Sequence, residues 1–297
     1  MHWYTGHPSS NIAPPLPLGD IRNLSIVGVG NVGLDIARIL LTPPALLEKE
    51  GYDFPAHVLS KLHESYHSLK HINIIGRRGP YEASFTAKEL RELISLGEHG
   101  VHMTPIPEEH FEVGTRTLTR QQKRVSQLLR DGTQKYAAAK AEKTWSVDFF
   151  RDPIQLTDSK LTLAHTTVDP LTLRSQPTTD TSVIQSDLTV LSLGFEDSGV
   201  HALIGQLTSS TSGMTPLPRL YATGWANTGA KGVIANSMRD AYEVADSMWE
   251  DWVLTEADKG PMSLPGNSSW EEQATEVAKQ LQIDRQTIQP YPGQLLQ

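Results

Sequence analysis

The chain has 297 residues, of which 38% are hydrophobic and 20% charged, and its formal net charge is −8. This composition is typical of a folded protein with one or two domains and a buried core. The chain has no cysteine, which excludes disulfides, thiolate zinc sites and cysteine-held iron–sulfur clusters within it, so any redox chemistry must use a bound cofactor. The negative charge argues against a nucleic acid partner. No apolar run reaches the roughly 20 residues that span a bilayer, and the first residues do not resemble a signal peptide.

The first hundred residues alternate between short apolar runs and amphipathic stretches, which predicts strands and helices in turn. After a Pro- and Gly-rich connector at 1–20, we expect a strand at 23–30, a helix from Asn31 that ends at Pro43 and Pro44, a helix at 54–69, a strand from His71 and a helix at 86–97 closed by Gly97.

The rest of the chain is less regular. Residues 108–180 are polar and show few clear periods, so we assign no elements there. We expect strands at 186–196 and 219–225, a helix at 232–252 and, in the Pro- and Gln-rich tail, a helix at 269–282. Strands that alternate with helices predict an α/β fold with a parallel sheet.

The stretch IVGVGNVGLDIARIL contains a glycine pattern typical of dinucleotide-binding turns. Gly28, Gly30 and Gly33 make GxGxxG between a strand and a helix. The first glycine permits a tight turn, the second lets a pyrophosphate approach the backbone, and the third allows the helix to pack closely on the strand. Free N–H groups at the helix start would face the phosphates. An ordinary tight turn between strand and helix is the alternative.

The end of the second strand indicates which dinucleotide fits. An NAD site places an acidic residue there, whereas this sequence has Arg77 and Arg78 in IIGRRGP. Guanidinium groups supply charge and paired donors to a 2′-phosphate, so NADP(H) is favoured, with a solvated surface pair as the alternative. The arginines follow the glycines at more than the usual spacing of roughly 20 residues, so we interpret the 54–69 helix as an insertion.

That inserted helix carries a rival motif. HESYH at 63–67 matches HExxH, in which two histidines bind zinc and a glutamate activates its water. No third ligand stands out downstream at a recognised spacing, so a zinc metallopeptidase is kept only as a distant alternative.

A second glycine cluster follows the 219–225 strand. Gly224, Gly229 and Gly232 leave the backbone uncovered beside a helix start, and Trp225 offers a planar wall. Two interpretations stay open: a second site for an anionic or electron-rich group, or a connecting loop with a core tryptophan.

Five segments resemble, in this order, the mitochondrial NADPH-adrenodoxin (ferredoxin) reductase family: WYTGHP, GVGNVGLDIARILLTPP, IIGRRGPYEASFTAKELREL, LSLGF and LYATGWANTGAKGVIANSM. The match is dense over 1–97 and 188–248 and loose between them. The family consists of flavoproteins that pass electrons from NADPH via FAD to a [2Fe–2S] ferredoxin. The resemblance implies an oxidoreductase of the ferredoxin/adrenodoxin-NADP⁺ reductase type in the mitochondrial matrix, either free or peripheral to the inner membrane.

The resemblance also implies roles for individual residues. Val29, Gly30, Asn31 and Val32 would contact the NADP pyrophosphate, Arg77 and Arg78 the 2′-phosphate, Glu89 the nucleotide, and Trp225 with the backbone of Gly232, Val233 and Ile234 the flavin. Since the cofactors carry the hydride step, no catalytic acid, base or nucleophile is expected in the chain.

A basic stretch at 116–130, RTLTRQQKRVSQLLR, contains no acidic residue. The family's ferredoxin-docking residues fall here, which implies that Arg120, Lys123 and Arg124 attract and bind an acidic ferredoxin. A solvated helix face is the alternative.

This sequence lacks one part of the family pattern. Family members begin with a dinucleotide fold that grips FAD through a GxGPAG turn, which this sequence does not contain. We therefore expect an inter-domain connector at 1–20, an NADP-binding Rossmann-like domain at 21–196 and the C-terminal part of a second, FAD-binding dinucleotide fold at 197–297. Such a chain would bind NADP(H) without holding FAD tightly, so a non-catalytic NADP(H)-binding fragment is the main alternative to a reductase.

Overall fold

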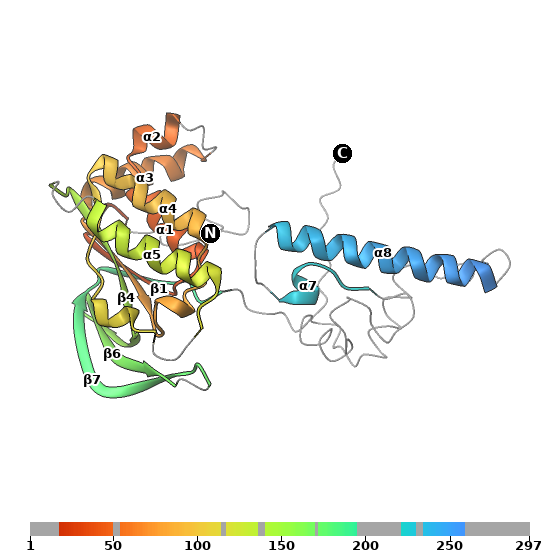
Figure 1. The fold of residues 1–297 in the computed structure, drawn as a ribbon. Helices are drawn as coiled ribbons and strands as arrows, with labels where there is room; N and C mark the ends of the chain where they lie inside the picture. The colour runs from red at the N-terminus through yellow and green to blue at the C-terminus, as the bar shows by residue number, and fades with distance from the viewer. Residues whose placement is uncertain are drawn as a thin grey trace. The chain divides into compact units, whose positions relative to one another are not determined.

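The computed structural model describes residues 18–49, 54–113, 117–135, 140–169, 172–194, 221–229 and 234–258. The chain divides into two compact units, Met1–Gly194 and Phe195–Gln297 (Figure 1). The first unit contains both sheets, and the described part of the second is helical.

A five-stranded parallel sheet forms the centre of the first unit, in the order β3-β4-β2-β1-β8. Its strands are β1 (Asn23–Val27), β2 (His71–Gly76), β3 (Val101–Met103), β4 (Lys143–Phe149) and β8 (Leu188–Leu191). β1 and β2 are buried on both faces after their first residue, which explains why each is a continuous apolar run in the sequence. The expected α/β fold with a parallel sheet is confirmed.

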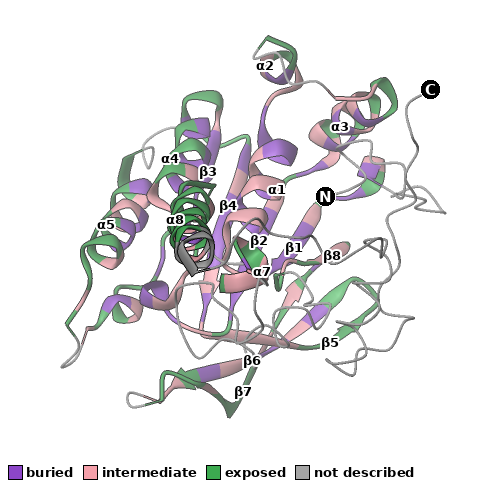
Figure 2. Cartoon of the chain, turned by 90° about the vertical axis from the view of Figure 1, so that its right-hand side faces the viewer, coloured by how far each residue is buried: buried purple, intermediate pink, exposed green. Residues whose placement is uncertain are grey.

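Helices pack on one face of this sheet (Figure 1). They are α1 (Asn31–Leu41), α2 (Pro44–Lys49), α3 (Ala56–Ser68), α4 (Ala87–Ser95) and α5 (Arg120–Lys135), with 3-10 turns η1 (Leu18–Asp20), η2 (Pro80–Glu82), η3 (Leu96–His99) and η4 (Glu108–Phe111). The main core joins buried leucines of α1, α4 and α5 to Ile72, Ile74 and Trp145 of the sheet, the purple interior in Figure 2.

A three-stranded antiparallel sheet follows β4 and leads into β8. It consists of β5 (Arg151–Thr157), β6 (Lys160–Val168) and β7 (Ser175–Gln185). Leu161 and Leu163 of β6 pack against Ile75 of β2. Because successive strand residues point to opposite faces, Ile74 joins the main core while Ile75 meets this smaller sheet on the other side.

Two expected helix ends differ from the structure. Pro44 begins α2, since the first turn of a helix does not need the N–H that proline lacks. α4 continues into η3, and the left-handed cap is Gly100, with φ 78°, in place of Gly97. The middle region, to which we assigned no elements, contains α5 and β4 to β7.

The described part of the second unit contains α7 (Trp225–Thr228) and α8 (Ile234–Asp258). The helix expected at 232–252 is confirmed from Ile234 onward. The strand expected at 219–225 is wrong in its described part, since Tyr221 makes a single bridge and Trp225 begins α7. The chain bends at Gly224, whose N–H, with the Thr223 hydroxyl, donates to Asp240 of α8. The helix expected at 269–282 lies outside the described residues.

Candidate functional site

The glycine turn, residues 28–31, lies at the carboxyl end of β1. Gly28 has φ 126°, and a Cβ atom on it would lie 2.1 Å from the backbone oxygen of Ser192. A Cβ atom on Gly33 would lie 2.8 Å from the oxygen of Gly28 and 3.3 Å from the side chain of Ile26. Position 28 therefore needs glycine for its backbone conformation and its close contact with Ser192, and position 33 needs glycine so that the helix can pack on the strand.

The helix after this turn has an open N-terminus. Gly30 is the N-cap of α1 and supplies no side-chain hydrogen bond to it. The first N–H groups of an α-helix have no partner within the helix, and they carry its positive dipole end. The turn therefore offers backbone donors to an anion.

The arginine pair, Arg77 and Arg78, follows β2, which pairs with β1. The backbone oxygens of the pair are fixed: the Thr166 hydroxyl donates to that of Arg77 at 2.7 Å, and the Phe150 N–H to that of Arg78 at 3.3 Å. Arg77 is exposed and Arg78 half-buried. Within the described ranges neither guanidinium forms an ion pair, so two positive charges stand at this strand end without a neutralising carboxylate.

Glu89 lies in the first turn of α4. One of its carboxylate oxygens, Oε2, is buried and has no hydrogen-bond partner among the described residues. Burying an unsatisfied polar atom is costly, so this oxygen fits a site where a ligand hydroxyl donates to it.

These groups lie at one edge of the parallel sheet. The Gly28 N–H donates to the oxygen of Ile75 at 2.9 Å, which ties the glycine turn to the end of β2 just before the arginine pair. Ligands of open α/β sheets bind outside the carboxyl ends of the strands. The structure thus brings the glycine turn, the arginine pair and the start of α4 to the edge where ligands of such sheets bind.

The attachment of the loop after β2, residues 77–86, to the glycine turn was not predicted from the sequence. Its Ser84 donates twice to the oxygen of Val29, from N–H at 2.9 Å and from the hydroxyl at 3.1 Å. The Thr86 N–H donates to Oδ1 of Asn31 at 2.7 Å. The serine and threonine just before a helix were the available signal, but such residues usually cap their own helix, and here no side chain caps α4.

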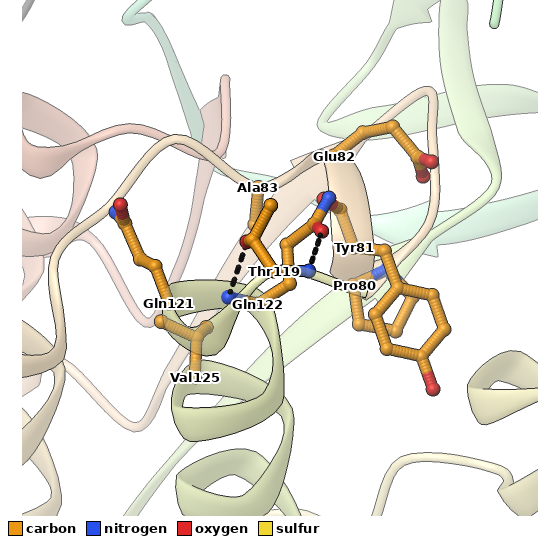
Figure 3. Close-up of a pocket in the computed structure, with 8 residues that line it drawn as sticks. All are labelled: Pro80, Tyr81, Glu82, Ala83, Thr119, Gln121, Gln122 and Val125. Carbon is orange, nitrogen blue, oxygen red and sulfur yellow. Dashed lines mark hydrogen bonds between the residues drawn. The ribbon is translucent and has the colours of Figure 1, made fainter. Parts of the chain in front are cut away.

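A pocket of about 250 Å³ lies between η2 and the start of α5 (Figure 3). It is lined by Pro80, Tyr81, Glu82, Ala83, Thr119, Gln121, Gln122 and Val125. Thr119 and Gln122 cap α5 reciprocally, each side chain bonding the other's N–H at 3.2 and 2.9 Å. Gln122 Nε2 also donates to the oxygen of Tyr81 at 2.8 Å. The start of α5 is therefore joined to the 77–86 loop.

The basic stretch lies largely on α5. Arg120, Lys123 and Arg124 are exposed and form no ion pair within the described ranges. Arg130 differs, because its guanidinium lies 4.5 Å from the ring centroid of Phe111 and 3.5 Å from Glu108. Arg116 lies outside the described residues. The free positive charge is thus concentrated in the first turns of the helix.

A polar network lies on the face of β2 and β4 opposite the main core. His71 Nδ1 is 2.7 Å from the Thr144 hydroxyl, and its Nε2 is 3.0 Å from Oδ1 of Asn73. Ser146 donates to Asn73 and to Asp148, both at 3.1 Å. Burial lowers the pKa of His71 and raises that of Asp148, because each environment disfavours the charged form.

The HESYH residues have other partners. On α3, His63 Nε2 lies 3.3 Å from Glu48 and Glu64 bonds Lys61 at 2.5 Å. The described part of the chain contains no group of three His, Asp or Glu side chains arranged to hold a metal ion.

The second glycine cluster forms a tight turn. Gly224 and Gly229 have φ 62° and 74°, and Trp225 between them is 46% exposed. Asp240 holds the turn, accepting also from Asn227 Nδ2 at 2.9 Å. Trp225 is therefore not a core side chain in this turn. Ile234 begins α8, and the predicted contacts Gly232 and Val233 lie outside the described residues.

No family model matches the chain. It is 31% identical over 289 residues to the mitochondrial NADPH:adrenodoxin oxidoreductase of Bos taurus, across 90% of this chain and 57% of that protein. It is 32% identical over 310 residues to the mitochondrial protein of the same name from Arabidopsis thaliana, across 88% and 61%. Over most of its length this chain is thus similar to the NADPH:adrenodoxin oxidoreductases. It spans somewhat more than half the length of these relatives.

The fold agrees with this similarity. FprA of Mycobacterium tuberculosis, solved in complex with NADPH, superposes with a TM-score of 0.73 at 25% identity, over 94% of this chain and 62% of that one. The resemblance stated from the sequence is therefore confirmed. None of the described helices combines the length and apolarity needed to cross a membrane.

Proposed function

We propose that this chain carries the NADP(H)-binding part of an NADPH-dependent flavoprotein reductase, with residues 21–196 as the NADP-binding domain. The convergence of an uncapped glycine turn, an unpaired arginine pair and a buried, unsatisfied glutamate oxygen at one sheet edge carries the proposal. The names of the relatives and the NADPH complex of FprA support it.

In this proposal each group at the edge has one task. The glycine turn (Gly28 to Asn31), with Val32 and Gly33, receives the pyrophosphate on backbone N–H groups. The arginine pair binds the 2′-phosphate with paired donors, and Glu89 accepts a hydrogen bond from the nucleotide. Asn31 contributes its side-chain NH₂, because its Oδ1 already accepts from Thr86.

We also propose that residues 197–297 form the C-terminal part of an FAD-binding fold. FAD supplies the chemistry of accepting hydride and passing on single electrons. The residues of this chain would only position it: Trp225 offers an exposed ring and Ile234 begins α8, while Gly232 and Val233, the other proposed flavin contacts, lie outside the described residues. Gly224, which precedes α7, supports this role, since a Cβ atom on it would meet nothing within 4 Å and the backbone there is uncovered.

The proposed electron acceptor is an acidic [2Fe–2S] ferredoxin of the adrenodoxin type. Arg120, Lys123 and Arg124 would bind it, supported by their exposure and by the absence of acidic partners among the described residues. Mitochondrial location is proposed as well, since the relatives are named mitochondrial.

The deciding experiment is calorimetric titration of the chain with NADPH and with NADH. The wild type should bind NADPH much more tightly than NADH. The double variant Arg77→Ala/Arg78→Ala should have an affinity for NADPH as low as that for NADH. Arg22→Ala is the matched control, an exposed arginine that precedes β1 at the opposite end of the sheet. Equal affinities for both nucleotides in the wild type would contradict the proposal.

A further inference from the structure

The loop after β2 carries the arginine pair at one end and leads into the helix that carries Glu89 at the other. Between them, three hydrogen bonds hold it on the glycine turn: two from Ser84 to the oxygen of Val29, and one from the Thr86 N–H to Asn31 Oδ1. Phe85, fully buried between these residues, anchors the same segment in the main core.

The glycine turn also approaches the loop closely at Gly30. A Cβ atom on Gly30 would lie 3.4 Å from the Ser84 hydroxyl, so the turn and the loop are in contact at the glycine itself. The bond to Asn31 joins the first residue of α1 to the N-cap of α4. The N-termini of both helices are thus held together at the sheet edge.

We propose that Ser84 and Asn31 are positioning residues that set the separation between the pyrophosphate site on the glycine turn and the 2′-phosphate site on the arginine pair. This inference rests on the proposed function. A ligand with two anionic groups gains affinity only when both sites can be occupied at once, because the second contact is then intramolecular. A loosely held loop keeps each site but loses that gain.

Asn31 has two separable tasks in this arrangement. Its Oδ1 accepts from the Thr86 N–H, and the same bond fixes the orientation of its NH₂ group. Asn31→Asp keeps an acceptor for Thr86 and replaces the donor by a negative charge, whereas Asn31→Ala removes both groups. Ser84→Ala removes one of the two bonds to Val29 and no proposed ligand contact.

The test combines three ligands with hydrogen exchange. The affinity for NADPH measures the two sites acting together. The affinity for NADH measures the glycine turn alone, and the affinity for adenosine 2′-monophosphate measures the arginine pair alone. Ser84→Ala and Asn31→Ala should lower the preference for NADPH over NADH about two- to tenfold, the value of one lost neutral hydrogen bond, and leave adenosine 2′-monophosphate binding within about twofold. Ser95→Ala is the control, since that exposed hydroxyl donates within α4, to the backbone oxygen of Glu92.

Hydrogen exchange of the nucleotide-free protein tests the attachment directly. The Thr86 amide should exchange faster in Asn31→Ala and stay protected in Asn31→Asp, although Asn31→Asp also weakens NADPH. An unchanged NADPH/NADH ratio in Ser84→Ala and Asn31→Ala, or an equal loss of adenosine 2′-monophosphate binding, would overturn the positioning role alone. A wild type without preference for NADPH would instead overturn the proposed function and this inference with it.

Discussion

The ammonium nitrogen of Lys143 lies 4.2 Å from the ring centroid of Tyr66. The same nitrogen donates to the backbone oxygen of Tyr66 and, at 2.7 Å, to that of Leu69. Leu69 is the C-cap of α3, so a buried cation satisfies carbonyls at the negative end of the helix. The contact joins the start of β4 to the insertion that precedes β2.

Lys143→Met should therefore destabilise the protein. The substitution keeps the apolar stem but leaves buried carbonyls without donors, at a cost of about 1–3 kcal/mol. Urea denaturation followed by circular dichroism measures the change, and Lys140→Met, at an exposed lysine on the same segment, is the control. Equal midpoints for both variants would show that the helix end does not depend on this cation.

Gly28→Ala should cost more stability than Gly194→Ala. Both glycines have positive φ, 126° and 103°, but a Cβ atom would meet the Ser192 oxygen at 2.1 Å in the first case and nothing within 4 Å in the second. Gly194→Ala should lose only the conformational term of roughly 1–2 kcal/mol and keep NADPH binding. Gly28→Ala should also lose NADPH binding, since the turn must move. Thermal melts and NADPH titration check both, and equal losses would contradict the contact argument.

Charge reversal on α5 should weaken ferredoxin binding without affecting NADPH. Arg124→Glu should reduce the affinity severalfold at low salt, and the difference from wild type should shrink as salt rises, because exposed charges are screened beyond about 8 Å at physiological ionic strength. Lys160→Glu, at an exposed lysine that begins β6, is the matched control. Unchanged ferredoxin binding in Arg124→Glu would remove α5 from the docking surface.

Acidification should destabilise the fold through His71. Its pKa is lowered in the folded state, chiefly by burial, so the unfolded chain binds the proton more readily. Stability is then highest above the unfolded value of about 6.5 and falls as the pH drops below it. Asp148 acts in the opposite sense, since its raised folded pKa makes stability fall with rising pH above about 4.

The measurement is the unfolding free energy between pH 7 and pH 5. His71→Gln should flatten the decline relative to wild type, and His57→Gln, at an exposed histidine of α3, should not. The same slope in His71→Gln and wild type would assign the acid sensitivity to other groups.

The sequence predicted elements that form continuous apolar runs, and it missed β4, whose buried apolar residues alternate with polar ones. β1 and β2 are continuous apolar runs, and the glycines between β1 and α1 mark the turn. β5 and β7 were missed because most of their residues are exposed, so no apolar alternation marks them. α5 was missed as an element because a few buried residues, such as Val125 and Leu129, are all that distinguish its core face from a charged linker.

The residue types of the candidate site could be predicted from the sequence, but the contacts between its segments could not. A glycine motif and an arginine pair have local signals, since each depends on one stretch of chain. The attachment of Ser84 to Val29 links residues 55 positions apart, and the unsatisfied oxygen of Glu89 depends on burial by its neighbours. Such features arise only from the tertiary packing of segments that are far apart in the sequence.

The contact between Gly28 and Ser192 also sets an order of events during synthesis. β1 is paired on one side by β8, and the Ser192 N–H donates to the oxygen of Val27 at 2.7 Å, directly before the glycine turn. The ribosome produces the turn early and its flanking strand about 160 residues later. A nascent chain therefore exposes an unpaired edge of β1 throughout that interval, when pairing with another chain is a hazard.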